Sequence, residues 1–294
     1  MQSKPRYKVV SDIERFDERD NVQARNNLEP GSEEYKNFYL RNPEWEEKDR
    51  KSRELSKVRI GNPLDLPLFA QQIGNLVRFG SEGLVDGPVF SQRREFSPER
   101  ATEKIKGFAR FLGADLVCIG PLNPAHVYTH VGKTWHDPAR NYGVPIHLNH
   151  KNAISIAVAI RPNLIKAGPV LPMISEVMRV YTKLAIISTT LAGYIRGLGY
   201  PARAHMITNY QVLCVPLAID AGMGELGRNG IMITKELGSS LKLTVVTTDL
   251  PLIYDQPIDI GVDEFCQDCK ICEETCPSGA IPHGKKKVVR GIEK

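Results

Sequence analysis

Hydrophobic residues recur at helical spacing in several parts of the chain. Ser97 and Pro98 provide an N-cap and a first helical residue, apolar side chains then recur every three or four positions, and Gly113 marks the end. A longer stretch of the same spacing, followed by Gly199, predicts a helix over residues 172–198. Shorter helices are expected over residues 43–54, 64–78 and 215–221.

Short apolar runs rich in valine, isoleucine and alanine predict buried strands over residues 116–119, 152–160 and 241–247. The mixture of helices and strands indicates an α/β (α+β) core. Its boundaries follow from changes in composition along the chain. We expect a charged N-terminal region over 1–94 that wraps the core, an α/β core over 95–260, and a small metal-binding module over 261–294.

The composition excludes several classes of protein. The 294 residues carry a net charge of +5 without a basic stripe, which argues against a nucleic-acid partner. The longest apolar stretch in a helical context, residues 184–195, is too short to span a bilayer. No apolar segment follows the N-terminus, so the sequence shows no signal peptide and is expected to be soluble as it stands.

The strongest chemical signal is the cysteine run, Cys266, Cys269, Cys272 and Cys276, with Pro277 after it. Its spacing, C-x2-C-x2-C-x3-C-P, is that of a bacterial ferredoxin-type iron–sulfur site. Zinc sites usually combine two distant C-x2-C pairs, and no second pair exists in this sequence. The run therefore favours an iron–sulfur cluster, with zinc or uncoordinated thiols as the alternatives.

The ligand set of this run is incomplete for a two-cluster module. In such modules the fourth cysteine serves the other cluster, and a cysteine from a second motif closes the first. No cysteine follows Cys276 here, so we expect a chain truncated at its C-terminal end within the module. Cys118 and Cys214 lie in apolar stretches and are expected to be small core residues.

Gly222, Gly224 and Gly227 match the G-x-G-x-x-G pattern of dinucleotide-binding proteins. That pattern needs a strand before it and a helix after it, whereas a helix-like segment precedes it here. The glycines are better explained by close approach of the backbone, either to other backbone or to a flat cofactor.

Several segments together resemble the corrinoid-dependent reductive dehalogenases, in order and spacing. They are 111–117, 146–151, 199–200, 215–230, 247–252 and the cysteine run, and the charged region around residues 15–17 and 41–44 is similar too. The resemblance implies a nitroreductase-like, corrinoid-binding core with a partial ferredoxin-like 4Fe-4S module. It also implies a base-off corrinoid and two [4Fe–4S] clusters.

The implied reaction replaces a carbon-bound halogen by hydrogen with two electrons and a proton. The resemblance places a proton-donating tyrosine at Tyr181, an asparagine at Asn209 and a basic residue at Lys242. It implies that residues 199–230 line the corrinoid pocket. The implied cofactor-binding residues there are Tyr200, His205, Gly222, Gly224, Gly227 and Asn229, and the implied metal ligands are Cys266, Cys269, Cys272 and Cys276.

The residues themselves give partial support for these roles. Tyr181 lies on the apolar face of the long predicted helix, where a tyrosine is by default a core aromatic. A phenol of pKa near 10 is a weak acid unless a cation stabilises the phenolate. Lys242 is the only charged residue in an otherwise apolar predicted strand, which is unusual for a lysine without a function. Asn209 also suits an ordinary turn.

Two other functions compete. Epoxyqueuosine reductase, a related corrinoid enzyme, carries a catalytic aspartate where this chain has Thr208. A plain electron carrier or a non-catalytic corrinoid-binding remnant would also suit the incomplete cysteine set, so the truncated chain could be inactive. The resemblance implies an organohalide substrate, an electron donor, a small membrane anchor protein and a place at the outer face of the cytoplasmic membrane. The sequence does not specify which organohalide.

Overall fold

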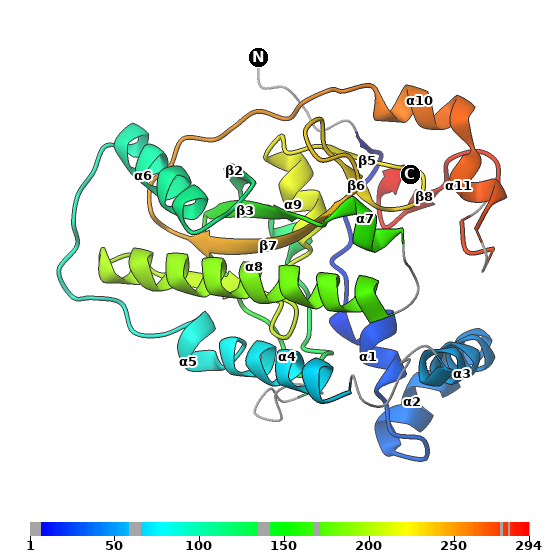
Figure 1. The fold of residues 1–294 in the computed structure, drawn as a ribbon. Coiled ribbons are helices and arrows are strands. Elements are labelled where there is room, and N and C mark those ends of the chain that lie inside the picture. The colour runs from blue at the N-terminus through cyan, green and yellow to red at the C-terminus, as the bar shows by residue number, and fades with distance from the viewer. Residues whose placement is uncertain are drawn as a thin grey trace.

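A four-stranded antiparallel sheet forms the centre of the protein (Figure 1). The structure is a computed structural model and describes residues 7–58, 66–134, 142–166, 171–276, 279–281 and 283–293. The strand order is β2–β3–β7–β4, with bounds Leu116–Pro121, Asn152–Ala159, Leu241–Thr248 and Ala202–His205.

Helices cover both faces of this sheet. The long helix α8 (Leu171–Gly197) lies along one face, and α9 (Cys214–Asp220) packs on the other (Figure 1). A second layer, α4 (Leu66–Phe79) and α5 (Glu82–Val85), packs on α8. The helix α6 (Pro98–Phe111) packs against β2 and α8. Because α8 is covered by the sheet and by α4, it is apolar on more than one side.

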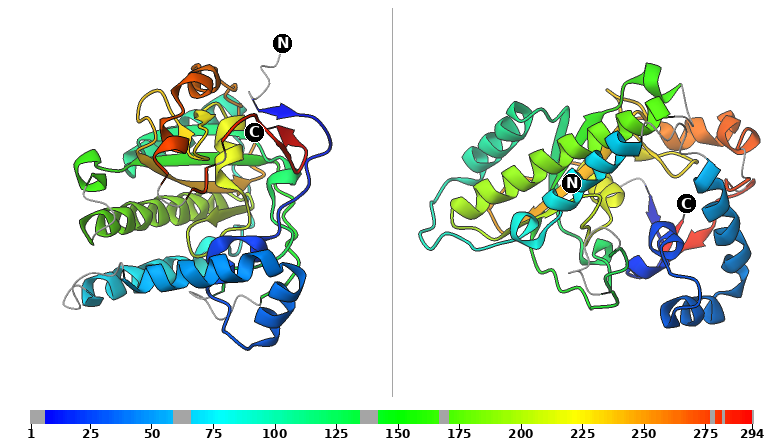
Figure 2. Two further views of the ribbon diagram at one scale, coloured as in Figure 1. Left: turned by 90° about the vertical axis from the view of Figure 1, so that its right-hand side faces the viewer. Right: turned by 60° about the horizontal axis from the view of Figure 1, so that its bottom comes forward.

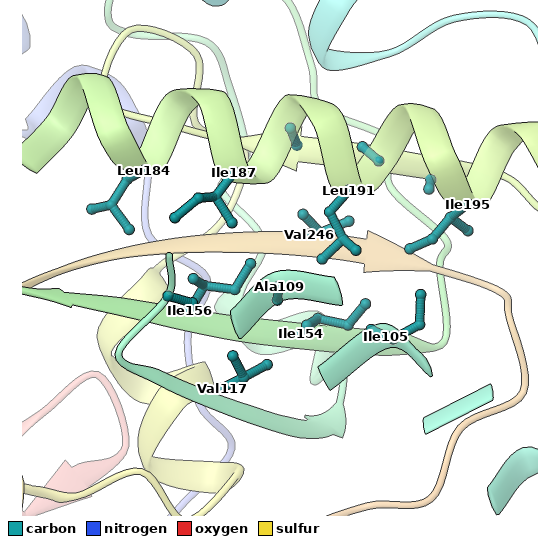
Figure 3. Close-up of a cluster of buried hydrophobic side chains, with 14 of the residues drawn as sticks. Ile105, Ala109, Val117, Ile154, Ile156, Leu184, Ile187, Leu191, Ile195 and Val246 are labelled. Atoms are coloured by element: carbon teal, nitrogen blue, oxygen red, sulfur yellow. The ribbon is translucent and has the colours of Figure 1, made fainter. Parts of the chain in front are cut away.

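The main core lies between α8 and the sheet. Figure 3 shows Leu184, Ile187, Leu191 and Ile195 of α8 directed toward the strands, and all four are at most 1% exposed. Val246 of β7 packs in this core, whereas its neighbour Val245 packs in a second core with Leu217 of α9. Burial on both faces explains why the adjacent residues Val245 and Val246 are both apolar instead of alternating with a polar residue.

The N-terminal region contributes a small helical unit and, before it, an extended segment over residues 7–17, the N-terminal strap. Its helices are α1 (Val22–Asn26), α2 (Glu33–Arg41) and α3 (Pro43–Val58). Arg25 of α1 and Asp49 of α3 form a buried ion pair at 2.9 Å. Before them, β1 (Lys8–Val9) pairs with β9 (Ile292–Glu293), which pairs with β8 (Val288–Val289) (Figure 2).

The structure confirms the mixed helix and sheet architecture and the predicted long helix. The strands predicted at 116–119, 152–160 and 241–247 correspond to β2, β3 and β7. β4 was not predicted, because Ala-Arg-Ala-His is short and half charged or polar. The domain bounds at residues 94 and 260 stay a prediction. None of the helices in the described ranges has the length and apolar character that a membrane crossing requires.

The glycine-rich segment, residues 222–230, belongs to a tight hairpin between β5 (Glu225–Leu226) and β6 (Met232–Ile233). A Cβ atom on Gly222 would lie 2.0 Å from the carbonyl oxygen of Gln256, and one on Gly224 would lie 2.3 Å from that of Ile233. The backbone therefore packs directly on other backbone here. The helix α9 before it, in place of a strand, is inconsistent with a dinucleotide fold.

Gly222→Ala should destabilise the protein more than Gly230→Ala. Both glycines have similar left-handed φ angles, +76° and +74°, but nothing lies within 4 Å of a Cβ on Gly230. The strain alone costs about 1–2 kcal/mol, and the clash at Gly222 adds roughly 1–3 kcal/mol. Urea unfolding measures both free energies. Equal losses in the two variants would contradict the close packing of Gly222 on Gln256.

Candidate active site

The site forms where β7 continues beyond the end of its neighbour β4. β4 pairs with residues 245–248 of β7, so on that side residues 241–244 have no partner strand in the described structure. Helix α8 passes over this part of the sheet (Figure 1). Tyr181 of α8 lies close to Lys242 of β7. The Nζ atom of Lys242 is 5.6 Å from the centre of the tyrosine ring. The fold thus brings together two of the three predicted catalytic residues.

Burial controls the electrostatics of this pair. It raises the pKa of Tyr181 to about 12, with a further contribution from nearby Cys214. Burial lowers the pKa of Lys242. Within the described residues no carboxylate forms an ion pair with Lys242, so its charge has no acidic partner there. Burial therefore favours the protonated phenol at Tyr181 and works against the charge on Lys242.

This arrangement suits proton donation. A phenol of pKa about 12 holds its proton at neutral pH, and it gives that proton up only if the phenolate is stabilised. A cation over the ring contributes to that stabilisation because part of the phenolate charge is delocalised into the ring. Lys242 occupies this position over the ring of Tyr181.

Three further titratable residues lie next to this pair and were not predicted as site residues. The Nζ of Lys133 lies 4.5 Å from the ring centre of Tyr210. Burial raises the pKa of Tyr210 and, to about 12, that of Cys214. Cys214 thus packs as the small core residue that its apolar context predicted. In the sequence, only the position of Tyr210 beside Asn209 could have indicated a place near the site.

Asn209 lies in a different network. Its side-chain amide donates to the carbonyl oxygen of Gly80 and to Glu82 Oε1, each at 2.9 Å. Its Oδ1 accepts from Arg203 Nη2 at 2.8 Å. Asn209 is fully buried and fixes its turn to the α4–α5 connection. Among the described contacts none joins it to Tyr181 or Lys242.

Tyr200 and His205 have distinct surroundings. Tyr200 donates to the carbonyl oxygen of Arg94 at 3.2 Å and borders a cavity of about 490 Å³. His205 is fully buried, and its Nδ1 accepts from the backbone N–H of Gln211 at 3.2 Å. Its Nε2 therefore donates to Thr247 Oγ1 at 2.9 Å. Both ring nitrogens are engaged within the chain.

The glycine-rich segment contacts its own chain at all four of its predicted cofactor positions, Gly222, Gly224, Gly227 and Asn229. Gly222 and Gly224 face other backbone, and Gly227 faces the Ile233 side chain, 2.9 Å from an added Cβ. Asn229 Oδ1 accepts from the N–H of Ile231 and closes a turn. The sequence explains these glycines by close approach of the backbone either to other backbone or to a flat cofactor. The contacts in the described structure are with other parts of the chain. Gly230 alone in this segment leaves open space.

Three residues of the cysteine run lie on two short helices, Cys266 and Cys269 on α10 (Val262–Cys269) and Cys272 on α11 (Ile271–Glu274), and Cys276 follows the end of α11. Lys270, with φ of +50°, makes the sharp turn between them. All four cysteines are partly buried. As donors they suit an iron–sulfur cluster. In the described ranges, however, no three His, Cys, Asp or Glu side chains converge on one point as metal ligands.

No family model matches the chain, but it is similar to several known proteins. The chain is 31% identical over 221 residues to a tetrachloroethene reductive dehalogenase from Dehalobacter restrictus, covering 64% of this chain and 40% of that protein. It is 31% identical over 212 residues to one from Sulfurospirillum multivorans, covering 64% of this chain and 42% of that protein.

Solved structures show the same relationship. The catabolic reductive dehalogenase NpRdhA superimposes on 100% of this chain and 40% of its own, with a TM-score of 0.76 and 27% identity. A second reductive dehalogenase structure, described as suggesting a mechanism for B12-dependent dehalogenation, covers 75% of this chain and 31% of its own, with a TM-score of 0.65 and 30% identity. The chain is therefore similar to reductive dehalogenases both in sequence and in fold.

The chain spans about 40% of the length of these curated proteins. The similarity to an epoxyqueuosine reductase from Cyclobacterium marinum is shorter. It reaches 41% identity over 64 residues, which is 22% of this chain and 20% of that protein.

The Tyr181 hydroxyl should titrate well above an ordinary tyrosine. Labelling tyrosine Cζ with ¹³C and assigning the signal with Tyr181→Phe would give its midpoint by NMR. We expect about 12, and a still higher value in Lys242→Met, because removal of the cation leaves the phenolate less stable. A midpoint near 10, or one unchanged in Lys242→Met, would contradict the burial or the coupling.

Proposed function

We propose that this chain is the corrinoid-binding, proton-donating part of a reductive dehalogenase, which replaces a carbon-bound halogen by hydrogen. The observation that carries the proposal is the Tyr181–Lys242 pair. Two residues 61 positions apart in the sequence, expected in these roles from the family resemblance, lie in contact at one point of the fold. A tyrosine that served only as a core aromatic would not need a lysine beside it. A buried lysine that has no acidic partner in the described structure is unusual unless it has a function.

The chemistry balances as a two-electron reduction. The carbon–halogen bond breaks, halide leaves, and the carbon accepts two electrons and one proton. Tyr181 holds that proton on its hydroxyl oxygen, and Lys242 stabilises the phenolate left behind. Water then reprotonates the phenolate, because its pKa lies above the pH of the medium. The substrate is an organohalide, and relatives are named for tetrachloroethene, trichloroethene and chloroethene.

A bound corrinoid would supply the redox chemistry at carbon. We propose that the α/β core is nitroreductase-like. Tyr200 borders a cavity of about 490 Å³ near the end of β7 opposite to Lys242, so its position does not support a corrinoid contact beside the Tyr181–Lys242 pair. His205, Gly222, Gly224 and Gly227 are engaged with their own chain, so any contact they make with the cofactor is through the backbone. Asn209 would act by fixing the turn that carries Tyr210.

Electrons would arrive through iron–sulfur chemistry on the cysteine run, within a ferredoxin-like module. An external electron donor would complete the pathway, and a small membrane anchor protein is a further proposed partner. The donor set of Cys266, Cys269 and Cys272 fits a cluster, with Cys276 serving a second cluster.

The alternative function, epoxyqueuosine reduction, has less support. Thr208 stands where that enzyme carries a catalytic aspartate, and its hydroxyl donates to the carbonyl oxygen of Leu76 at 3.1 Å. Thr208 is 3% exposed and holds α4 in place. A tightly packed hydroxyl at this position cannot replace a proton-transferring carboxylate.

Anaerobic reconstitution tests the proposed function. The chain would be incubated with hydroxocobalamin, iron and sulfide, freed of unbound cofactor, and supplied with reduced methyl viologen and 3-bromo-4-hydroxybenzoate, the ligand of an NpRdhA structure. We expect cobalt to co-elute with the protein and bromide to be released. Tight nicotinamide uptake without cobalt would instead favour the dinucleotide interpretation of the glycine-rich segment. Cobalt uptake without bromide release would favour a non-catalytic corrinoid-binding protein.

Tyr181→Phe should reduce the rate of bromide release by roughly 10²–10⁴-fold while cobalt binding persists, since general-acid catalysis contributes about that much. Tyr194→Phe is the matched control, because Tyr194 lies on the same helix and packs against Phe108 at 4.9 Å. It should retain near-normal turnover. Normal turnover in Tyr181→Phe would leave Tyr181 as a core aromatic.

The charge of Lys242 should matter more than its shape. Lys242→Arg keeps a cation near the ring of Tyr181 and should retain much of the activity, although the two side chains differ in geometry. Lys242→Met removes the charge and should lose most of it. Steady-state bromide release measures both, and equal rates in the two variants would exclude an electrostatic role.

Cys269→Ser should abolish iron binding, whereas Cys118→Ser should leave it unchanged. Cys269 belongs to the cysteine run, while Cys118 lies on β2, where burial raises its pKa to about 11. Iron analysis and electron paramagnetic resonance of the reconstituted chain measure the result. Undiminished iron in Cys269→Ser would exclude the run as the cluster site.

A further inference from the structure

Arg228, in the glycine-rich segment, reaches from the core to the cysteine run. Its Nε donates to the carbonyl oxygen of Cys266 at 3.1 Å, and its Nη1 lies 2.6 Å from Glu273 Oε2. Nη1 also approaches the carbonyl oxygen of Gly284 at 3.4 Å. One guanidinium therefore contacts the first cysteine of the run, a residue within the run and a residue after it.

Glu273 is the buried partner in this contact. It directly follows Cys272, and its side chain is 6% exposed, whereas that of Arg228 is 20% exposed. His283 Nδ1 also approaches Glu273, at 3.6 Å, but that ring is 68% exposed. Arg228 is therefore the principal partner of Glu273. Charges at this degree of burial are screened less by solvent than surface charges.

The same hairpin holds the run at a second point. Glu225 is 3% exposed, and its Oε2 accepts from the backbone N–H groups of Ile260 and Val262 at 3.0 Å each. This carboxylate satisfies N–H groups at the start of α10, where a negative charge is favourable. Gly222 and Gly224 allow the close packing that places Glu225 and Arg228.

We propose that the charges of Arg228 and Glu273 shift the reduction potential of the iron–sulfur cluster held by the cysteine run in opposite directions. The inference rests on the proposed cluster. Reduction adds negative charge to a cluster, so a nearby cation raises the potential and a nearby anion lowers it. Arg228 contributes the cation and a hydrogen bond to a ligand residue, and Glu273 contributes the anion beside Cys272.

The sign of the effect separates this role from a mechanical one. If the pair only held the run in place, removing either partner would break the same ion pair and disturb the cluster in the same way. If the pair acts through charge, the two removals shift the potential in opposite directions. Removing both partners restores a value near that of the original chain.

Electron paramagnetic resonance during an anaerobic redox titration of the reconstituted chain measures the midpoint potential directly, without any assay of turnover. We expect a lower potential in Arg228→Met, a higher one in Glu273→Gln, and a value near the original in the double variant. Arg228→Lys should lie close to the original chain. Lys286→Met is the control for a neighbouring cation, because Lys286 is 42% exposed and pairs with Asp263.

Glu273→Gln is nearly isosteric and decides the test even if Arg228→Met fails to fold. A lower or unchanged potential in Glu273→Gln would overturn the inference, as would shifts of the same sign in both single variants. Failure of the original chain to bind iron at all would instead overturn the proposed cluster, and the inference with it. Absence of dehalogenation with normal potential shifts would affect only the proposed activity.

Discussion

The site depends on a mismatch in length between two neighbouring strands. β7 has eight residues and β4 has four, so the first half of β7 lies beyond the end of β4. Lys242 lies in this half, while the second half carries Val245 and Val246 into the cores on opposite faces of the sheet. Packing of Val245 and Val246 in the two cores holds β7 in position. The position of β7 in turn places Lys242 next to Tyr181 of helix α8.

The main elements of the fold could be predicted from the sequence because they are buried on both faces or amphipathic. The apolar residues of β3 and β7 and the apolar spacing of α8 identify them directly. β4 could not be predicted, since Arg203 and His205 are buried through hydrogen bonds made by distant residues such as Glu82 and Thr247. The sheet formed by β1, β8 and β9 depends on pairing between opposite ends of the chain and leaves no local pattern.

The candidate site was predictable to a similar extent. Lys242 stood out as a charge within an apolar strand, and its proximity to Tyr181 followed only from the family resemblance. Asn209 was expected near the same pair, yet its amide is committed to Arg203, Glu82 and Gly80. Its role in catalysis stays a prediction. Lys133 could not be predicted as a site residue, because it belongs to no sequence motif. It lies over Tyr210 only through a contact between two loops that are distant in the sequence.

The glycine-rich segment connects the two halves of the proposed electron path. Its glycines pack on the core, and its charged residues Glu225 and Arg228 hold the cysteine run. Farther along the chain, Arg290 stacks on Phe16 of the N-terminal strap at 4.6 Å, which fixes the segment after the run. The segment that carries the cysteines is therefore contacted by the glycine-rich segment, and the segment after it by the N-terminal region.

The central claim is that the corrinoid binds where Tyr181 and Lys242 meet. Anomalous X-ray diffraction at the cobalt edge, from crystals of the chain grown with hydroxocobalamin, tests it most directly. The account predicts one strong cobalt peak on the side of the sheet where Tyr181 of α8 faces Lys242 of β7. A cobalt peak bordered by other elements, or a fully bound corrinoid remote from Tyr181, would contradict it.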